Sequence, residues 1–412
     1  MANSLELKGI QLVISKRLSG IVNDIFPFSL LPLFLLVGIF YVNFVCRVVM
    51  APLLPVIKAD LGLGLTRAGS LFLLTATGYC SGLFMSGFVT ARLSHRRTLL
   101  VSMGVMGAAM LALSQTTSTT GMYLSLITAG LSAGFYLPSG IVIVTELVSR
   151  EHWGRAMAFH ELAPNLGFIT APLLAEALLR LLSWRGALAF MGSWSVLMGL
   201  IFFFFGQGGE HRGEAPRLSA MRSILTQPSF WTMAAFFTVS IGASFGVYSM
   251  LPLFLVSERG MSREWANTLV SLSRMVAFLI LFLSGWITDR AGQKYAMVLF
   301  LTITGLFILL IGMIQVPVMT PLLVVLQASS AACMFPVGFT MLSTLFPNSL
   351  RSLAVSLVIM IGYLIGGGAF PLGIGYIAER LSFSWSFSLI GLLALTTVPL
   401  LFLIHDDGRA DP

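Results

Sequence analysis

Two short stretches of similar shape, SGFVTARLSHRR at residues 86–97 and SGWITDRAGQKY at residues 284–295, decide how this chain is organised. Their first residues lie 198 positions apart (284 − 86), which is close to half of the 412-residue chain. Two prolines inside apolar stretches, Pro138 and Pro336, have the same separation. These correspondences predict a chain built from two copies of one structural unit.

The composition indicates that this chain is surrounded by a lipid bilayer. Hydrophobic residues make up 57% of the sequence, charged residues 10%, and the mean hydropathy is +0.93, whereas soluble domains are typically about 45–50% apolar. Apolar stretches of roughly twenty residues, each long enough to cross about 30 Å of hydrocarbon as a helix, recur along the chain. We therefore predict an all-α polytopic membrane protein with twelve transmembrane helices, at residues 31–55, 68–90, 98–115, 122–147, 156–179, 185–205, 230–256, 266–288, 296–315, 320–345, 352–377 and 384–404.

Six of these helices lie on each side of a polar stretch that contains glycines, a proline and charges of both signs. We predict a six-helix bundle at residues 31–205, a cytoplasmic linker at 206–229 and a second six-helix bundle at 230–412. Isoleucine and leucine recur at helical spacing within residues 1–30, which predicts an amphipathic segment on the inner leaflet.

Membrane topology, and not nucleic-acid binding, explains the net charge of +8. With the N-terminus in the cytoplasm, fifteen Lys and Arg residues fall on the cytoplasmic side and seven on the other, as the positive-inside rule requires. We expect both termini in the cytoplasm, and a first helix that stays as an anchor because the first 28 residues do not look like a cleavable signal. We also expect a monomer, surrounded by lipid, in a bacterial inner membrane.

The second of the two short stretches carries a glycine, then Asp-Arg four residues later, then a glycine and a basic residue: Gly285, Asp289, Arg290, Gly292 and Lys294. Together with the six-plus-six arrangement, this pattern resembles the major facilitator superfamily of secondary transporters over essentially the full chain. The resemblance implies parallel repeats with a substrate cavity between them near the midplane. It also implies a cytoplasmic latch, in which Asp289 faces the start of the fifth helix near Arg155 and which breaks when the cavity opens inward.

The first copy of the latch departs from the family pattern. Gly87 and Arg92 are kept, but Ala91 stands where the aspartate is expected and Ser94 replaces the second glycine. Either Glu146, at the cytoplasmic end of the fourth helix, pairs with Arg92, or the outward-open state is less favoured than in a transporter with both aspartates. Alternatively, these basic residues only set the topology.

Two arginines, Arg47 and Arg274, fall near the middle of predicted transmembrane helices, one in each half. An arginine at that depth costs about 2.5–3.5 kcal/mol even on insertion scales, so each needs a partner or a cavity. Asn43 precedes Arg47 by one helical turn, and Ser271 and Asn267 share a helical face with Arg274. We expect these polar faces to line the central cavity.

Three roles for the two arginines are open at this point. A guanidinium binds carboxylate or phosphate through a planar fork, so two convergent arginines favour an anionic substrate. The arginines could instead donate hydrogen bonds to carbonyls of broken helices, or pair with an acidic side chain. The only acids inside the predicted helices that suit such pairing are Glu161 and Glu176.

The fifth predicted helix begins with the sequence HELAP, at residues 160–164. Glu161 lies near the cytoplasmic end of this helix and could carry a coupling proton or bridge helices at an inner gate, and His160 could act likewise. A zinc protease would need a second histidine at position 164, which is Pro164, so we expect no metal and no cofactor.

Five further polar side chains inside predicted helices are candidates for substrate binding, although each could equally serve packing or hydrogen bonding: Tyr79, Tyr136, Tyr248, Gln327 and Tyr363. The three cysteines lack metal-ligand spacing and are interpreted as small packing residues. No nucleophile–base pair stands at usable spacing, so we do not expect an enzyme.

These patterns together predict a secondary transporter that moves a small organic anion, a carboxylate or an organophosphate, by alternating access. The first helix resembles organic-anion members of the superfamily, which often carry Asp-Arg where this chain has Cys46 and Arg47. Any coupling to protons therefore has to use Glu161 or His160. The alternative is an exporter of hydrophobic drugs or lipids, whose cavity the 21 methionines and 32 phenylalanines would line.

Overall fold

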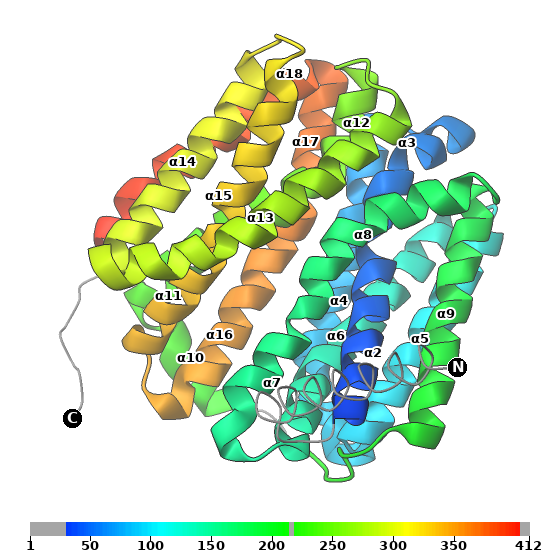
Figure 1. The fold of residues 1–412 in the computed structure, drawn as a ribbon, viewed down its shortest axis with the longest axis vertical. Helices are drawn as coiled ribbons and strands as arrows, with labels where there is room; N and C mark the ends of the chain where they lie inside the picture. The colour runs from blue at the N-terminus through cyan, green and yellow to red at the C-terminus, as the bar shows by residue number, and fades with distance from the viewer. Residues whose placement is uncertain (1–29, 214–217, 404–412) are drawn as a thin grey trace, which may run out of the picture.

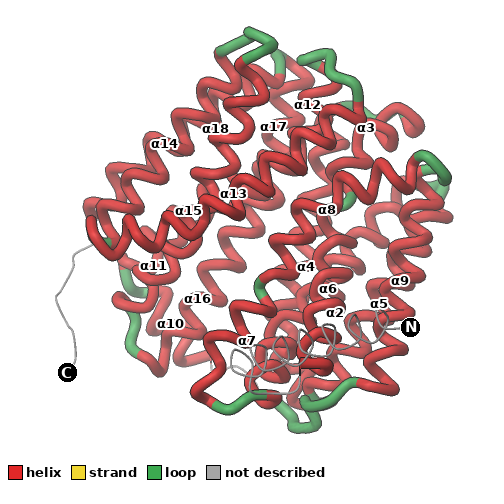
Figure 2. Tube along the Cα trace, viewed as in Figure 1, coloured by secondary structure: helices red, strands yellow, loops and turns green. Residues whose placement is uncertain are grey.

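A computed structural model of the protein describes residues 30–213 and 218–403 (Figure 1). Within that part of the chain the secondary structure is helical, without a strand (Figure 2). Twelve of the described helices are long and apolar enough to cross a membrane. The all-α fold with twelve transmembrane helices is therefore confirmed, while the amphipathic segment predicted for residues 1–30 lies, up to residue 29, outside the described residues.

The first half contains six spans, of which the first and the fifth are each broken into two helices. Its helices are α2 (Leu30–Val48), α3 (Met50–Leu61), α4 (Leu65–Leu93), α5 (His95–Gln115), α6 (Thr119–Leu147), α7 (Trp153–His160), α8 (Leu162–Leu179) and α9 (Trp184–Phe205). A short 3₁₀ turn, Arg150–His152, precedes α7.

The second half repeats this pattern, with its first and fifth spans interrupted by π-helical turns at Gly242–Gly246 and Tyr363–Ala369. Its helices are α11 (Pro228–Ile241), α12 (Val247–Ser257), α13 (Arg263–Ala291), α14 (Gln293–Met313), α15 (Met319–Leu345), α16 (Asn348–Gly362), α17 (Phe370–Arg380) and α18 (Phe383–Thr397), the last followed by a 3₁₀ turn, Val398–Leu403. The segment between the halves contains one further helix, α10 (Leu218–Leu225).

Prolines explain both breaks in the first half. Proline has no backbone N–H and its ring collides with the carbonyl four residues earlier, so a helix tends to break there. The helix α2 ends at Val48, four residues before Pro52, and α7 ends at His160, four residues before Pro164. The break at His160 places the His-Glu pair at a bend of the fifth span and not in a continuous helix.

The two latch loops share one backbone conformation, as the sequence repeat predicts. Ser94 has φ 101° and ψ 160°, and Gly292, which lies 198 residues later (292 − 94), has φ 86° and ψ 153°. A positive φ suits glycine and strains other residues. Ser94 is the only residue other than glycine with a positive φ in the described chain, and its hydroxyl caps α5 by accepting a hydrogen bond from the Arg97 N–H.

The two bundles are joined at the end of the molecule that lies away from the linker, which we call the distal face; the opposite end is the linker face (Figure 1). There α4 packs on α17, α3 on α12 and α8 on α13. Glycine makes the α4–α17 contact possible, because a Cβ at Gly69 would lie 2.2 Å from the Pro371 carbonyl oxygen and one at Gly375 would lie 2.2 Å from that of Leu65. Backbones this close hold the distal face shut.

Candidate functional site

Arg47 is buried on α2, with 8% of its surface exposed, and lies among aromatic rings. Its guanidinium carbon is 4.3 Å from the ring centre of Tyr79, 5.1 Å from Phe44 and 5.8 Å from Tyr363. Its Nε–H has no hydrogen-bond partner within the described residues. The charge is therefore stabilised by ring faces, and a donor of the planar fork is left unused.

Arg274, on α13, is as buried as Arg47 but is held by the backbone of the first π-helical turn. Its Nη1 donates to the Ser244 Oγ at 3.0 Å and its Nη2 to the Ser244 carbonyl oxygen at 2.6 Å. The guanidinium also lies over the rings of Phe168, at 4.6 Å, and Tyr248, at 5.0 Å. For Arg274, the hydrogen bond to a carbonyl of a broken helix is confirmed.

The π-helical turn Gly242–Gly246 explains why such a carbonyl is available. A π-helical turn widens the helix and leaves backbone acceptors for side chains, and such turns are frequent at functional sites. A second side chain uses this turn, because the Gln327 Nε2 donates to the Ala243 carbonyl oxygen at 2.9 Å. Gln327, predicted as a substrate ligand, thus has its amide N–H engaged by the protein backbone.

Six aromatic side chains connect the two arginines, and we call them the aromatic cluster. It comprises Phe44, Tyr79 and Phe168 from the first half and Phe245, Tyr248 and Tyr363 from the second. Neighbouring ring centres are 4.7–5.8 Å apart, and most pairs meet edge to face. Three rings from each half meet here, so the cluster lies on the interface that alternating access has to rearrange.

Several polar atoms beside this cluster are buried and lack partners within the described chain. Asn43 is 1% exposed, and neither its amide oxygen nor its amide nitrogen is hydrogen-bonded; the Tyr248 hydroxyl is also unbonded. Leaving a buried polar group unpaired costs about 1–3 kcal/mol, and buried polar groups in native proteins normally have partners. Asn43 lies one helical turn from Arg47, so α2 presents an amide and a guanidinium donor to the same region.

A second polar group lies inside the first bundle. The Tyr136 hydroxyl contacts the Leu36 carbonyl oxygen at 3.0 Å and the His160 Nε2 at 2.9 Å, and Phe40 stacks on the imidazole with ring centres 4.5 Å apart. The His160 Nδ1 lies 3.5 Å from the Glu161 Oε1. The hydroxyl of Tyr136, a predicted substrate-binding residue, is therefore engaged by His160 and by the backbone of α2.

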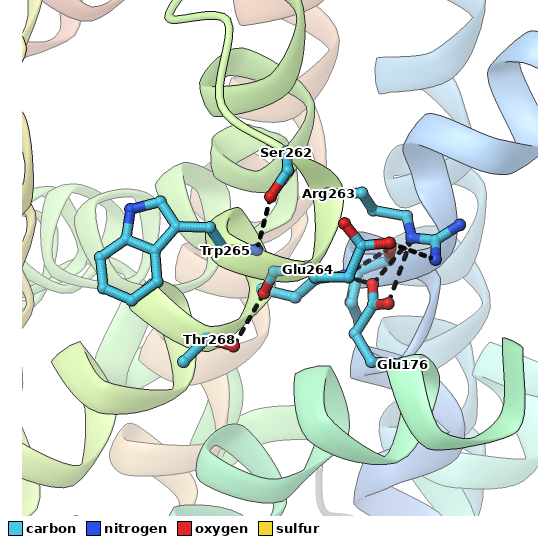
Figure 3. A network of polar contacts seen from close by, with 8 residues as sticks. Glu176, Ser262, Arg263, Glu264, Trp265 and Thr268 are labelled. Atoms are coloured by element: carbon cyan, nitrogen blue, oxygen red, sulfur yellow. Dashed lines mark hydrogen bonds and ion pairs between the residues drawn. The ribbon is translucent and has the colours of Figure 1, made fainter. Parts of the chain in front are cut away.

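The distal face is closed by an ion pair between the bundles, which we call the distal gate (Figure 3). The Arg263 Nε donates to both carboxylate oxygens of Glu176, at 3.0 and 3.2 Å. The Asn267 Nδ2 donates to the same carboxylate at 2.6 Å and contacts the Pro52 carbonyl oxygen at 3.3 Å. Glu176, considered as a partner for the two central arginines, thus pairs with Arg263 instead. Arg263 lies outside the predicted helix at residues 266–288.

The predicted latch is not engaged in this structure. Asp289 is exposed and makes no ion pair with any described residue. The pairing of Glu146 with Arg92 is also absent, since Glu146 Oε2 accepts a hydrogen bond from the Gly209 N–H at 2.6 Å while Arg92 is exposed. The bundles are therefore bonded at the distal face in a state where the predicted latch at the linker face is open.

The remaining latch residues lie at the surface of the linker face. The Arg290 guanidinium lies over the Trp286 ring at 4.3 Å, and the Lys294 Nζ lies 3.4 Å from the Phe402 carbonyl oxygen. A Cβ at Gly285 would meet no atom within 4 Å. No described residue packs closely against this glycine in this state.

Sequence reasoning found the two arginines, Asn43 and the tyrosines, but it missed Phe44, Phe168 and Phe245. Phenylalanine is common in this chain, with 32 residues, so no single one stands out. The usable signal was local glycine: GASFG at 242–246 and GGGA at 366–369 both lie in the π-helical turns. These turns carry or adjoin Phe245 and Tyr363.

Known proteins resemble this chain over most of its length. The sequence profile of the Major Facilitator Superfamily matches residues 33–292 and 264–412. The cis,cis-muconate transport protein of Acinetobacter baylyi is 23% identical over 84% of this chain and 87% of its own length. The probable sulfoacetate transporter SauU of Cupriavidus necator is 21% identical over 90% of this chain and 94% of its own.

Solved structures agree on the fold. A bacterial homologue of the human lysosomal transporter Spinster, in an inward-facing and occupied conformation, superposes with a TM-score of 0.77 at 16% identity, over 90% of this chain and 95% of that one. A D-xylose–proton symporter gives a TM-score of 0.71 at 17% identity, over 92% and 98%. With its twelve apolar helices and a profile match over nearly the whole chain, this multi-pass membrane protein is a transporter and not an enzyme, and it belongs to the Major Facilitator Superfamily.

Proposed function

We propose that this chain is a secondary transporter for a small, flat organic anion, which it moves by alternating access. The observation that carries the proposal is the pair of buried arginines, one from each half, joined by the aromatic cluster. The names of the two relatives support a carboxylate or sulfonate substrate, since one is a cis,cis-muconate transport protein and the other a probable sulfoacetate transporter.

The two arginines have different roles in this proposal. Among the residues that the structure describes, Arg47 has no acidic partner and keeps an unused Nε–H, so it can donate directly to a carboxylate, with the Asn43 amide beside it. Arg274 already donates to Ser244 and adds a fixed positive charge on the other side of the interface. The ring faces of the cluster suit a planar, unsaturated substrate. A ligand held by both halves would couple its binding to their relative movement.

Proton coupling is a further part of the proposal. Cys46 occupies the place of the acid that organic-anion members often carry, and Glu176 is engaged at the distal gate. Glu161 and His160 are the acid and base that we propose for this role, and their side chains lie next to each other. We place the protein as a monomer in a bacterial inner membrane with cytoplasmic termini and a cytoplasmic linker face; the bacterial relatives support that membrane.

The test is ligand-induced thermal stability of the purified protein. A ligand at ten times its Kd stabilises the folded state by about 1.4 kcal/mol. The panel contains cis,cis-muconate, nicotinate, sulfoacetate, sugar phosphates and the lipophilic cation tetraphenylphosphonium. The variants are Arg47→Gln and Arg274→Gln, with Arg222→Gln on the exposed face of α10 as the matched control.

If the proposal holds, a flat anion stabilises the wild type and Arg222→Gln, while Arg47→Gln loses the response and Arg274→Gln weakens it. The alternative is an exporter of hydrophobic drugs or lipids, which the six-ring aromatic cluster could also serve. Equal stabilisation of all variants by tetraphenylphosphonium, with no response to any anion, would replace the anion proposal with that exporter.

A further inference from the structure

We propose that His160 and Glu161 form a binding site for one proton, that the proton occupies the His160 Nδ1 facing Glu161, and that Tyr136 is the positioning residue that keeps this nitrogen open. The inference rests on the proposed function in one respect only: the bound proton would drive anion transport. The site itself follows from hydrogen-bond geometry inside the first bundle.

The first step concerns the imidazole tautomer. The Tyr136 hydroxyl contacts two groups, the Leu36 carbonyl oxygen at 3.0 Å and the His160 Nε2 at 2.9 Å. A carbonyl oxygen only accepts, so it takes the single hydroxyl hydrogen. The phenol oxygen then acts as the acceptor toward His160. The imidazole therefore carries its hydrogen on Nε2, and in the neutral form the Nδ1 has a lone pair.

The second step concerns what the Nδ1 faces. It is buried without a hydrogen-bond partner in the described chain, and its neighbour is the Glu161 carboxylate, with Oε1 at 3.5 Å. A lone pair and a carboxylate both accept hydrogen bonds, so this contact is unfavourable without a proton. One proton on the Nδ1 converts it into a charge-assisted contact between an imidazolium and a carboxylate.

The third step is access. The His160 side chain is fully buried, whereas half of the Glu161 side chain is exposed. A proton can therefore reach the buried nitrogen through the carboxylate. Pro164 breaks the helix here, so that His160 is the last residue of α7 and Glu161 lies between α7 and α8.

Tyrosine side chains are the titratable groups that face this pair from the neighbouring described helices. From α6 the titratable neighbour is Tyr136, and α2 contributes the Phe40 ring and the Leu36 carbonyl. On the α8 side, Asn165 donates to the Glu161 backbone carbonyl and leaves its carboxylate free of that amide. Tyr136 and Glu161 thus face His160, and Glu161 also lies close enough to Tyr79 of α4 for an electrostatic interaction.

Phe40 links this site to the substrate region. Its ring lies nearly parallel to the imidazole, with centres 4.5 Å apart, and it contacts Phe44 one turn further along α2. Phe44 lies beneath the Arg47 guanidinium. A ring face attracts a cation more strongly than a neutral ring, so protonation at His160 tightens the contact of α7 with the helix that carries Arg47.

The experiment titrates the full-length protein in nanodiscs after ¹⁵N-labelling of its histidines, of which the chain has only five. Nitrogen chemical shifts distinguish the two neutral tautomers and the imidazolium. The His160 signal is identified by its loss in His160→Gln. Test variants are Tyr136→Phe and Glu161→Gln, and His211→Gln, whose side chain is 85% exposed in the linker, is the matched control.

The proposal requires a neutral His160 with its hydrogen on Nε2, which takes up one proton as the pH falls. Tyr136→Phe removes the hydroxyl oxygen that accepts a hydrogen bond from the His160 Nε2–H. This bond is stronger when the imidazole is charged than when it is neutral. The titration midpoint of His160 should therefore fall by about one pH unit, which is a tenfold loss of proton affinity. Glu161→Gln should lower it as well, and it is a safe substitution because the side chain is half-exposed. His211→Gln should leave the midpoint unchanged.

Three outcomes overturn the proposal: a neutral tautomer with the hydrogen on Nδ1, a His160 that does not titrate, or a midpoint that neither Tyr136→Phe nor Glu161→Gln moves. If His160→Gln does not fold, the signal is assigned by the effect of Glu161→Gln on its neighbour. Because the probe is the proton alone, these outcomes leave the anion proposal standing, and a chain that binds no anion can still show this titration.

Discussion

Replacing Arg263 by glutamine is expected to open the distal face. Glu176 is the carboxylate that Arg263 neutralises across the interface, and only 9% of its side chain is exposed. In the variant the carboxylate keeps the Asn267 amide but loses its counter-charge while still buried. Opening the distal face would return the Glu176 carboxylate to water. The substitution therefore destabilises the closed state and spares the open one.

The structure sets the size of this effect. Breaking a fully buried ion pair by removing one partner costs about 3–5 kcal/mol, whereas an exposed pair contributes about 0–1 kcal/mol. Arg263 is 30% exposed, and Asn267 still bonds the carboxylate, so the pair lies between these limits. We expect about 1–2 kcal/mol, which is a change of roughly 5- to 30-fold in the ratio of closed to open molecules.

The assay is a spin-label distance measurement across the distal face. Leu181, between α8 and α9, and Val318, between α14 and α15, are 85% and 82% exposed, so nitroxides there disturb little. The three native cysteines are buried and would be replaced by alanine. Arg263→Gln should add a longer-distance population that is minor in the wild type.

Glu264→Gln provides the matched control. Glu264 bonds the Nη2 of the same arginine at 3.0 Å, but its side chain is 56% exposed and it lies on the same helix as Arg263. It does not join the two bundles, so its loss should leave the distance distribution unchanged. The reasoning is refuted if the distance distribution of Arg263→Gln is the same as that of the wild type. It is also refuted if Glu264→Gln shifts the distribution as much as Arg263→Gln does.

Two further predictions concern glycines. Gly69→Ala should prevent the closed distal face, because the new Cβ would lie 2.2 Å from the Pro371 carbonyl oxygen, while Gly373→Ala, with no atom within 4 Å of its Cβ, should not; the same spin-label pair reads both. Gly292→Ala should cost about 1–3 kcal/mol of stability through its φ of 86° alone, since it too meets no atom. Gly285→Ala, equally free of contacts but without a positive φ, should melt within error of the wild type, and equal melting of both would contradict the strain argument.

The number of spans and the duplication could be predicted because hydropathy and the repeat are both local to the sequence. Helix ends were less predictable. The first span was expected to end at residue 55, yet α3 continues to Leu61, where Gly62 ends it with a φ of 60°. The hydrocarbon core sets where apolar residues stop, whereas caps and tertiary contacts set where the helix stops. Pro55 lies inside α3, so it could not mark that end.

The candidate site was predictable only as far as charge made residues conspicuous. Arg47 and Arg274 stand out because a bilayer makes arginine costly. The aromatic residues around them do not stand out, because the sequence alone does not distinguish a phenylalanine that contacts a guanidinium from one that faces lipid. Glu176 shows the converse: its conspicuous charge was found, but its partner Arg263 comes from the other half, and only the closed distal face brings the two together.

The linker supplies an acidic side chain to the first latch loop, which has none of its own at position 91. Ala91 replaces the family's aspartate, and Arg96 instead meets Glu210 of the linker at 3.3 Å. The Glu210 side chain is 70% exposed, so this ion pair contributes little by itself. Hydrogen bonds to linker carbonyls attach the linker more firmly to the first bundle. The Arg96 N–H donates to the Gly209 carbonyl at 2.7 Å, and the Arg96 side chain donates to the Gly206 carbonyl at 2.7 Å.

These bonds divide the linker between the two bundles. Residues 206–213 are attached to the first bundle, as the Gly213 N–H donates to the Thr90 carbonyl at 3.2 Å. The helix α10 packs instead on α11 and α16 of the second bundle. Within the linker predicted for residues 206–229, the part up to Gly213 is therefore bonded to the first bundle and α10 packs on the second.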